Sequence, residues 1–167
     1  MGSRDGSIAS MNTLRFQLEK IEGDDGTIFW GANLFVDELL INDRYSIDWI
    51  DLAKSTFLAG NYFILTCGCG VPDCARLHEP IRVSHEVQTI GWHIIEPKPE
   101  RRFEFEKQQY RTAILEFLKS VKMVVPDSED SMEYSFGYYG FVASDLDECI
   151  KTLEIGVVAA LNEEEIA

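Results

Sequence analysis

Apolar and polar residues alternate along the first part of the chain in the pattern of β-strands. From Asn12 every second residue is apolar, which predicts a strand with one buried face that ends at a turn over residues 23–26. Residues 27–41 continue the pattern and predict two more strands, broken near Gly31 and Asn33. This part of the chain is therefore expected to form a meander of antiparallel strands.

A short helix and a short strand are expected next. The Ser46 hydroxyl can cap a helix by accepting hydrogen bonds from the free amides of its first turn, and the helix is expected to run to about Leu58. Residues 60–61 are a stop signal for that helix. The apolar residues 62–66 then predict a strand that leads directly into Cys67.

The second half of the chain contains a hairpin and the clearest helix. Alternation over residues 81–87, and again over residues 90–94, predicts two strands joined by a turn. Phe103 and Phe105 predict a brief third strand. A helix is expected next, because apolar residues recur at helical spacing. They are Tyr110, Ile114, Phe117, Leu118 and Val121.

The C-terminal part is predicted to end in another helix. Residues 133–142 form either a strand or a loop hinged at glycines, and Ser144 and Asp147 then have the spacing of a capping box. Strands followed by about three segregated helices indicate an α+β fold with a mainly antiparallel sheet. The apolar face of the last helix consists of Leu146, Ile150, Leu153, Val157 and Leu161.

Length and composition agree with one domain of this class. The chain has 167 residues, of which 46% are hydrophobic and 26% charged, which are ordinary values for a globular protein. Residues 1–10 are small and polar and resemble an expression leader. We therefore assign a single compact α+β domain to residues 11–167.

Acidic residues dominate the chain and are unevenly distributed. The net charge of −14 argues against a nucleic-acid binder held by phosphate contacts. Most of the excess lies in residues 127–167, where Lys151 is the single basic residue. This distribution has two interpretations: a solvated helix face with a frayed tail, or a surface that attracts a basic protein partner.

Signals for membranes and export are not evident. The longest apolar runs are far too short to cross a bilayer, and no N-terminal apolar run resembles a signal peptide. Four cysteines in a chain without an export signal indicate a reducing compartment, where clustered thiols serve metal or redox chemistry more often than structural disulfides. We therefore expect a cytoplasmic protein.

One segment contains the residues of a candidate metal site. Cys67, Cys69 and Cys74 have the spacing C-x-C-x4-C, and His78 follows four residues later. Three sulfurs and one imidazole are a complete tetrahedral ligand set for zinc. The sequence therefore predicts a structural zinc site, since four protein ligands leave no open position for water.

Two other interpretations of this segment stay open. The cysteines can form a metal-free reduced cluster at a tight turn, or a redox switch through a Cys67–Cys74 or Cys69–Cys74 disulfide. The fourth zinc ligand is also open. Besides His78, the candidates are His85, His93, Asp73 and Glu79.

The same segment carries a resemblance. Residues 62–74, which contain the pattern T-C-x-C-G-x-x-x-C, resemble a segment of uncharacterised bacterial proteins in which a similar hairpin and helix follow. The resemblance covers about residues 45–120. It implies a small intracellular bacterial protein and no particular activity. The spacing also resembles the zinc-binding tail of SET-domain methyltransferases, but their catalytic asparagine–histidine motif has no counterpart here.

Motifs of common enzymes fail on inspection. His78-Glu79 and His85-Glu86 each begin like the metalloprotease motif H-E-x-x-H, but neither has the second histidine. His85 shares the apolar face of its strand, which favours a core histidine over a catalytic base. We therefore favour a non-enzymatic interaction protein with an acidic surface for a basic protein. The alternative is a small metal- or thiol-dependent enzyme centred on the loop from Cys67 to His78.

Overall fold

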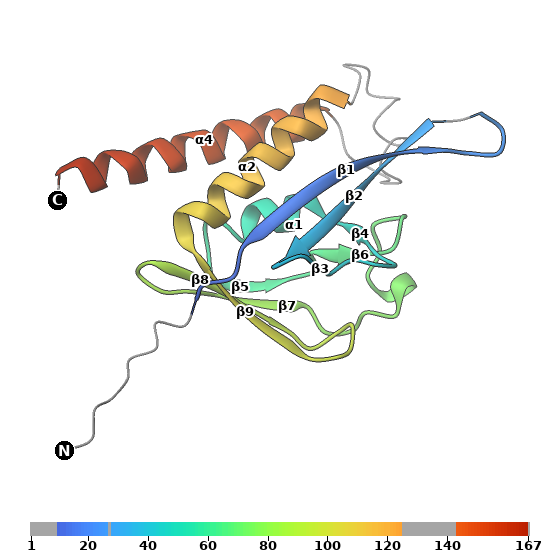
Figure 1. Cartoon of the computed structure of the whole chain (residues 1–167), viewed down its shortest axis with the longest axis horizontal. Coiled ribbons are helices and arrows are strands. Elements are labelled where there is room, and N and C mark those ends of the chain that lie inside the picture. The colour runs from blue at the N-terminus through green and yellow to red at the C-terminus, as the bar shows by residue number, and fades with distance from the viewer. Residues whose placement is uncertain (1–9, 27, 125–142, 167) are drawn as a thin grey trace.

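The computed structural model describes residues 10–26, 28–124 and 143–166, and the structural statements below concern this part of the chain. It confirms the α+β fold class, with antiparallel strand pairs and separate helices. The two long helices, α2 (Lys107–Val124) and α4 (Ala143–Ile166), lie together on one side of the strands (Figure 1).

A long hairpin dominates the first sheet. Its two strands pair along their whole length, and Gly26 closes the connecting turn with a φ of 79° and a hydrogen bond from its N–H to the Gly23 carbonyl oxygen. The predicted first strand and its turn are therefore confirmed. The strands of this sheet, in order, are β1 (Leu14–Glu22), β2 (Ile28–Val36) and β3 (Leu39–Leu40).

The predicted break near Gly31 and Asn33 is wrong. Both residues lie inside the continuous strand β2, where the ladder with β1 keeps the backbone extended. The chain instead turns at Asp37 and Glu38, whose φ angles are 48° and 65°. Asp adopts this left-handed conformation more often than most other residues do, which suits Asp37 to the bend between β2 and β3.

The predicted helix cap at Ser46 is also wrong. Ser46 is paired with Thr66 in a two-stranded sheet, and the Asp48 carboxylate caps the helix by accepting a hydrogen bond from Asp51 N over 3.0 Å. The helix is consequently shorter than predicted. The elements concerned are β4 (Ser46–Ile47), β6 (Leu65–Thr66) and α1 (Trp49–Lys54).

The second half contains a four-stranded antiparallel sheet, which confirms the predicted hairpin and the strand after it. Residues 62–66 do not form one strand. The Asp51 carboxylate accepts a hydrogen bond from Phe63 N, and this contact separates the end of one sheet from the start of another. The four strands, in spatial order, are β5 (Gly60–Tyr62), β7 (Ile81–His85), β8 (Thr89–Ile94) and β9 (Arg101–Glu106).

The core lies between the sheets and helices α2 and α4. The predicted apolar stripe of α2 is buried along its whole length, as are Leu146, Ile150 and Leu153 of α4. Val157 packs against this core from a half-buried position. Predictions for residues 133–142, for the Ser144 side chain in the capping box and for the Leu161 side chain lie outside the described residues.

A buried chain of hydrogen bonds joins α1, α2 and the four-stranded sheet. Trp92 Nε1 donates to the Tyr110 hydroxyl over 2.9 Å, and that hydroxyl lies 2.6 Å from Ser55 Oγ. Ser55 Oγ has a single proton, which it donates to the Leu52 carbonyl oxygen. Tyr110 must therefore donate to Ser55, so each group in the chain is satisfied.

Among the described residues, no helix has both the length and the apolar character that a membrane span requires.

Candidate metal centre

The cysteine loop begins where β6 ends. β6 is held by β4, so Cys67 leaves from a fixed strand end, and the Gly70 N–H donates to the Cys67 carbonyl oxygen over 2.9 Å. Gly70 has a φ of 78°, a backbone conformation that residues other than glycine rarely adopt. The loop therefore folds back within four residues, which keeps Cys67 and Cys69 together.

A single helical turn returns Cys74 to the first two cysteines. The 3-10 helix η1 (Asp73–Ala75) follows Pro72, whose carbonyl oxygen accepts hydrogen bonds from both Ala75 N and Leu77 N. Leu77 is 3% exposed and belongs to the core. This buried residue fixes the far end of the turn, so the position of Cys74 is set by packing as well as by hydrogen bonds.

Three sulfur atoms converge in this loop. The Sγ atoms of Cys67, Cys69 and Cys74 all lie within 4.8 Å of one another. Cys67 and Cys69 are half-buried and paired as a disulfide, whereas Cys74 is exposed and unpaired. The predicted Cys67–Cys74 and Cys69–Cys74 pairings are therefore not the ones formed. The turn that Gly70 N–H closes onto the Cys67 carbonyl oxygen brings the two Cα atoms to 5.3 Å, so Cys69 lies beside Cys67.

The backbone also approaches the first sulfur. Cys69 N lies 3.3 Å from Cys67 Sγ and donates a hydrogen bond to it. An amide aimed at sulfur favours the thiolate over the thiol, because it stabilises the negative charge. When the disulfide is reduced, the loop therefore offers three sulfurs suited to a soft or borderline metal ion such as zinc.

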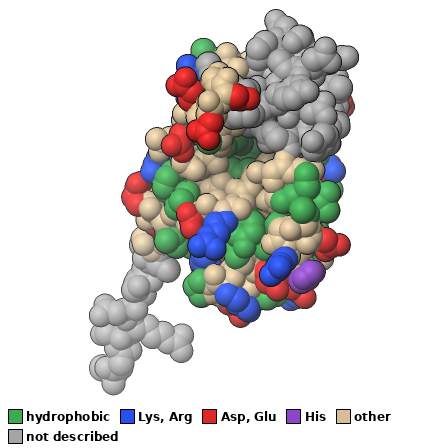
Figure 2. All heavy atoms as spheres, turned by 90° about the vertical axis from the view of Figure 1, so that its right-hand side faces the viewer, with side chains coloured by type: hydrophobic (Ala, Val, Ile, Leu, Met, Phe, Trp, Pro, Cys, Tyr) green, Lys and Arg blue, Asp and Glu red, His purple; other side chains and the backbone are tan. Residues whose placement is uncertain are grey.

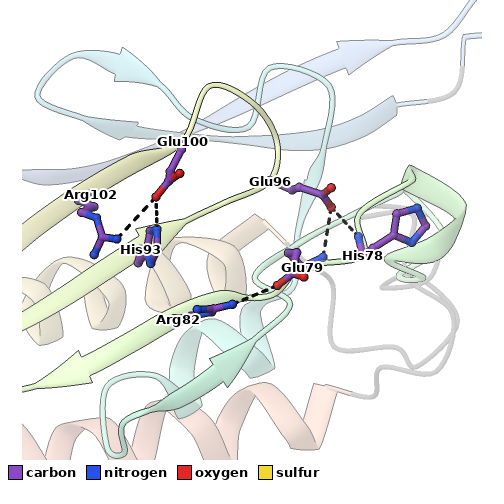
Figure 3. A network of polar contacts seen from close by, with 7 residues as sticks. All are labelled: His78, Glu79, Arg82, His93, Glu96, Glu100 and Arg102. Atoms are coloured by element: carbon purple, nitrogen blue, oxygen red, sulfur yellow. Dashed lines mark hydrogen bonds and ion pairs between the residues drawn. The ribbon is translucent and has the colours of Figure 1, made fainter.

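The structure does not bring His78 into the sulfur cluster. Its imidazole is 68% exposed and lies 3.6 Å from the Asp73 carboxylate. Figure 3 shows this ring pointing away from Glu96, while the backbone N–H groups of His78 and Glu79 point toward it. In the part of the chain that the structure describes, only the three cysteines form a group of this kind.

The other proposed fourth ligands have different partners. His85 Nε2 lies 2.8 Å from the Ser55 carbonyl oxygen, in a half-buried position that agrees with a core histidine. His93 Nε2 lies 2.5 Å from Glu100, and Glu79 contacts Arg82 (Figure 3).

Glu96 anchors the end of the cysteine loop to β8. One of its carboxylate oxygens accepts hydrogen bonds from His78 N at 2.8 Å and Glu79 N at 3.2 Å. These two backbone donors, the His78 one first, lower the pKa of Glu96. The loop is therefore held by β4 at its start and by a charged acceptor at its end.

The acidic residues of α4 are partly neutralised within the fold. Asp147 forms an ion pair with Lys122, and Glu154 lies 3.0 Å from Lys119, so both join α4 to α2. Glu148 is exposed. Asp127, Glu129 and Asp130 lie outside the described residues, as do the side chains of Asp145 and of residues 163–165.

A second acidic group, which was not predicted from the sequence, lies at the end of the β1–β2 hairpin. Glu19, Glu22, Asp24 and Asp25 are exposed there, with Lys20 as the single basic residue between them. Figure 2 views the molecule from the side on which this hairpin ends, and acidic side chains gather on part of that view. The signal in the sequence is the local run of acids around the predicted turn.

The chain was compared with protein-family models, curated proteins and solved structures, and no match was found in any of the three comparisons.

Proposed function

We propose that this chain is a non-enzymatic interaction protein, located in the cytoplasm, that binds a basic protein through the acidic end of its β1–β2 hairpin. The proposal rests on a difference between the acidic residues of α4 and those of the hairpin, which is whether they have basic partners. Asp147 and Glu154 are paired with lysines of α2. Within the described residues, Glu22 and Asp24 have no Lys or Arg partner.

The exposed carboxylates of Glu22 and Asp24, near the tip of a protruding hairpin, favour contact with another molecule. The hairpin extends beyond the rest of the strands (Figure 1), and Glu22 and Asp24 near its end are exposed. An acidic field of this kind raises the association rate with positively charged proteins and discriminates against negatively charged ones. The net charge of −14 adds to that field. An inhibitor of a basic toxin, such as a nuclease, is one protein of this class.

We further propose that the cysteine loop is a structural zinc site in the reduced protein. Cys67, Cys69 and Cys74 would hold the ion, and His78, the predicted fourth ligand, would have to move from its exposed position beside Asp73 to reach it. Zinc would then join the end of β6 to η1 in place of the Cys67–Cys69 disulfide. This role suits a short loop that contains few buried residues, because bound metal contributes directly to folding free energy.

The proposed function is tested by affinity capture with the full chain as bait, in lysate of the source cell. Three baits are compared: the unsubstituted chain, a hairpin variant with Glu22→Gln and Asp24→Asn, and a control with Glu86→Gln and Glu104→Gln. The control removes the same charge from exposed positions on β9 and beside β7. We expect a basic protein to be captured by the first and third baits and lost from the second. Equal capture by all three baits would overturn the proposal.

A metal-dependent enzyme is a second candidate, and one observation favours it. The described residues bring only three ligands together, and Cys74 is exposed. Three protein ligands with an accessible fourth position are typical of catalytic zinc. Substitution with cobalt separates the two cases. A visible spectrum that changes when azide is added indicates an open position and a catalytic site, whereas an unchanged spectrum indicates a closed structural site.

A further inference from the structure

The hairpin borders a cavity at the free edge of β2. β2 pairs with β3 only through Phe35 and Val36, so in the described part of the chain residues 28–33 have a strand on one side only. A cavity of about 360 Å³ lies at this edge, between the hairpin, the segment that leads into β4, and α2. Its volume is in the range of pockets that bind small ligands or single side chains.

Aromatic and carboxylate groups line this cavity together. Trp30 and Tyr45 contribute aromatic rings, and Glu19 and Asp43 contribute carboxylates. In the register of the hairpin Glu19 pairs with Gly31, while Trp30 pairs with Lys20, so Glu19 and Trp30 lie on opposite faces. The cavity therefore reaches around the edge of β2 instead of lying on one face of the sheet.

Backbone acceptors add to these groups. The Asn42 side chain binds the Ala32 carbonyl oxygen and the Leu34 N–H at the same edge. Backbone groups of alternate residues in a strand point to the same side, so the Trp30 carbonyl also points to this edge. Within the described residues, the Asn42 side chain forms hydrogen bonds with Leu34 N and the Ala32 carbonyl oxygen of this edge, but not with Trp30. The Trp30 carbonyl is thus left as an acceptor for a molecule that enters the cavity.

The charged lining favours a cation. Glu19 accepts a hydrogen bond from Asn33 Nδ2 at 3.3 Å, but in the described structure neither Glu19 nor Asp43 forms an ion pair with a Lys or Arg side chain. Arg44 also lines the cavity, which leaves two carboxylates for one guanidinium. The exposed acids Glu22 and Asp24 at the end of the hairpin strengthen this negative balance.

We propose that this cavity binds an arginine side chain of the basic partner, an inference that rests on the proposed function and deepens it. A guanidinium is planar, stacks on aromatic rings and offers five N–H donors. Trp30 supplies the ring that attracts cations most strongly, and the carboxylates and the Trp30 carbonyl supply acceptors. The acidic hairpin would attract the partner, and the cavity would recognise one of its side chains.

The test uses a small probe, so that it does not depend on the partner. N-acetyl-arginine amide is titrated into the full chain at constant ionic strength, and the indole N–H signal of Trp30 is followed by NMR. The signal is assigned with a Trp30→Phe variant, because the chain has three tryptophans. N-acetyl-citrulline amide, whose urea has the shape of guanidinium without its charge, is the matched control probe.

We expect saturable binding of the arginine probe, with the citrulline probe weaker by about threefold or more, the size of an exposed cation–aromatic contact. Glu19→Gln with Asp43→Asn should weaken the arginine probe by about threefold, because the exposed charge contacts to the guanidinium are lost. The control with Glu86→Gln and Glu104→Gln should leave binding unchanged. Absence of binding, equal binding of both probes, or full binding by the Glu19/Asp43 variant overturns the inference.

The two proposals fail in different ways. If a basic protein requires Glu22 and Asp24 but the arginine probe does not bind, the interaction function stands and the cavity assignment is wrong. If the probe binds as expected but capture does not depend on the hairpin, the cavity assignment stands and the proposed function is wrong.

Discussion

The backbone N–H of Cys69 donates a hydrogen bond to the sulfur of Cys67 over 3.3 Å, in a loop where Cys74 Sγ lies within 4.8 Å of both cysteine sulfurs. The turn that directs the Cys69 amide at the Cys67 sulfur also brings the sulfurs of Cys69 and Cys74 close to it. The structure shows a Cys67–Cys69 disulfide with a free Cys74, and in the proposed reduced state three thiolates would surround a metal ion.

Metal binding is predicted to require reduction. Protein treated with a phosphine reductant, which converts the Cys67–Cys69 disulfide to two thiols, should bind about one zinc ion per chain, measured by elemental mass spectrometry. Cys74→Ser should abolish stoichiometric zinc, because it leaves two sulfurs. Cys149→Ala is the matched control, since Cys149 packs against the core on α4 and should not affect the metal. Zinc retained at full stoichiometry by Cys74→Ser would contradict the site.

The buried hydroxyl of Tyr110 is predicted to be important for stability. Tyr110→Phe removes the acceptor of Trp92 Nε1 and leaves that donor unsatisfied in the core, which should lower the free energy of unfolding by about 1–3 kcal/mol. Tyr45→Phe is the matched control, because no hydrogen bond of the Tyr45 hydroxyl occurs in the described structure, and it should change stability by less than about 0.5 kcal/mol. Denaturant unfolding measures both. Equal stability of Tyr110→Phe and the parent would contradict the network.

Much of the fold follows from periodicity, and the exceptions have local causes. The buried stripe of α2 and the β7–β8 hairpin were predictable because long regular elements repeat their pattern many times. The bend at Asp37 and Glu38 was not, because an ion pair between Arg15 and Glu38 and hydrogen bonds from Asn12 and Thr13 to Asp37 support it from across the sheet. Such tertiary contacts leave no periodic signal.

The candidate site was predictable only in part. The cluster of three cysteines was visible because its ligands are close in sequence. The cavity could not be predicted from the sequence, because Glu19, Trp30 and Asp43 are far apart in it and are brought together only by the folding of the hairpin and the segment before β4. The acidic hairpin was not predicted, because in the sequence it is only a short local run of acids, much smaller than the excess in residues 127–167.

His85 is predicted to make stability depend on pH. Burial, which exceeds the opposing effect of the hydrogen bond to Ser55, lowers the pKa of His85 below its ordinary value of 6.5, and Lys107 and Arg111 add to the lowering. The unfolded chain therefore binds a proton at a higher pH than the folded chain, so this contribution is complete above pH 6.5 and is lost as the pH falls through the lowered folded value.

The contribution of His85 is measured by comparing urea unfolding of the parent and of His85→Gln from pH 7.5 downward. The parent should lose stability more steeply than the variant, whose amide can still donate to the Ser55 carbonyl oxygen. Parallel pH profiles would show that His85 does not titrate differently in the two states.

Glu96 is predicted to order the end of the cysteine loop. Its lowered pKa means that the carboxylate favours the folded state at neutral pH, and this effect is lost as the pH falls through the folded pKa, below the ordinary 4.5. Glu96→Ala should speed hydrogen exchange at the His78 and Glu79 amides. Glu100→Ala is the control, since Glu100 binds His93 and Arg102 instead. Unchanged exchange in Glu96→Ala would argue against this anchor.

The proposed function requires that Glu22 and Asp24 of the hairpin contact a basic protein. The most direct measurement is calorimetric titration of the captured protein into the parent chain and into the Glu22→Gln, Asp24→Asn variant, each at low and at high salt. We predict that the parent binds more tightly than the variant at low salt, and that the difference shrinks at high salt because exposed charges are screened. Equal affinity of the two chains at both salt concentrations would contradict a role of Glu22 and Asp24 in binding.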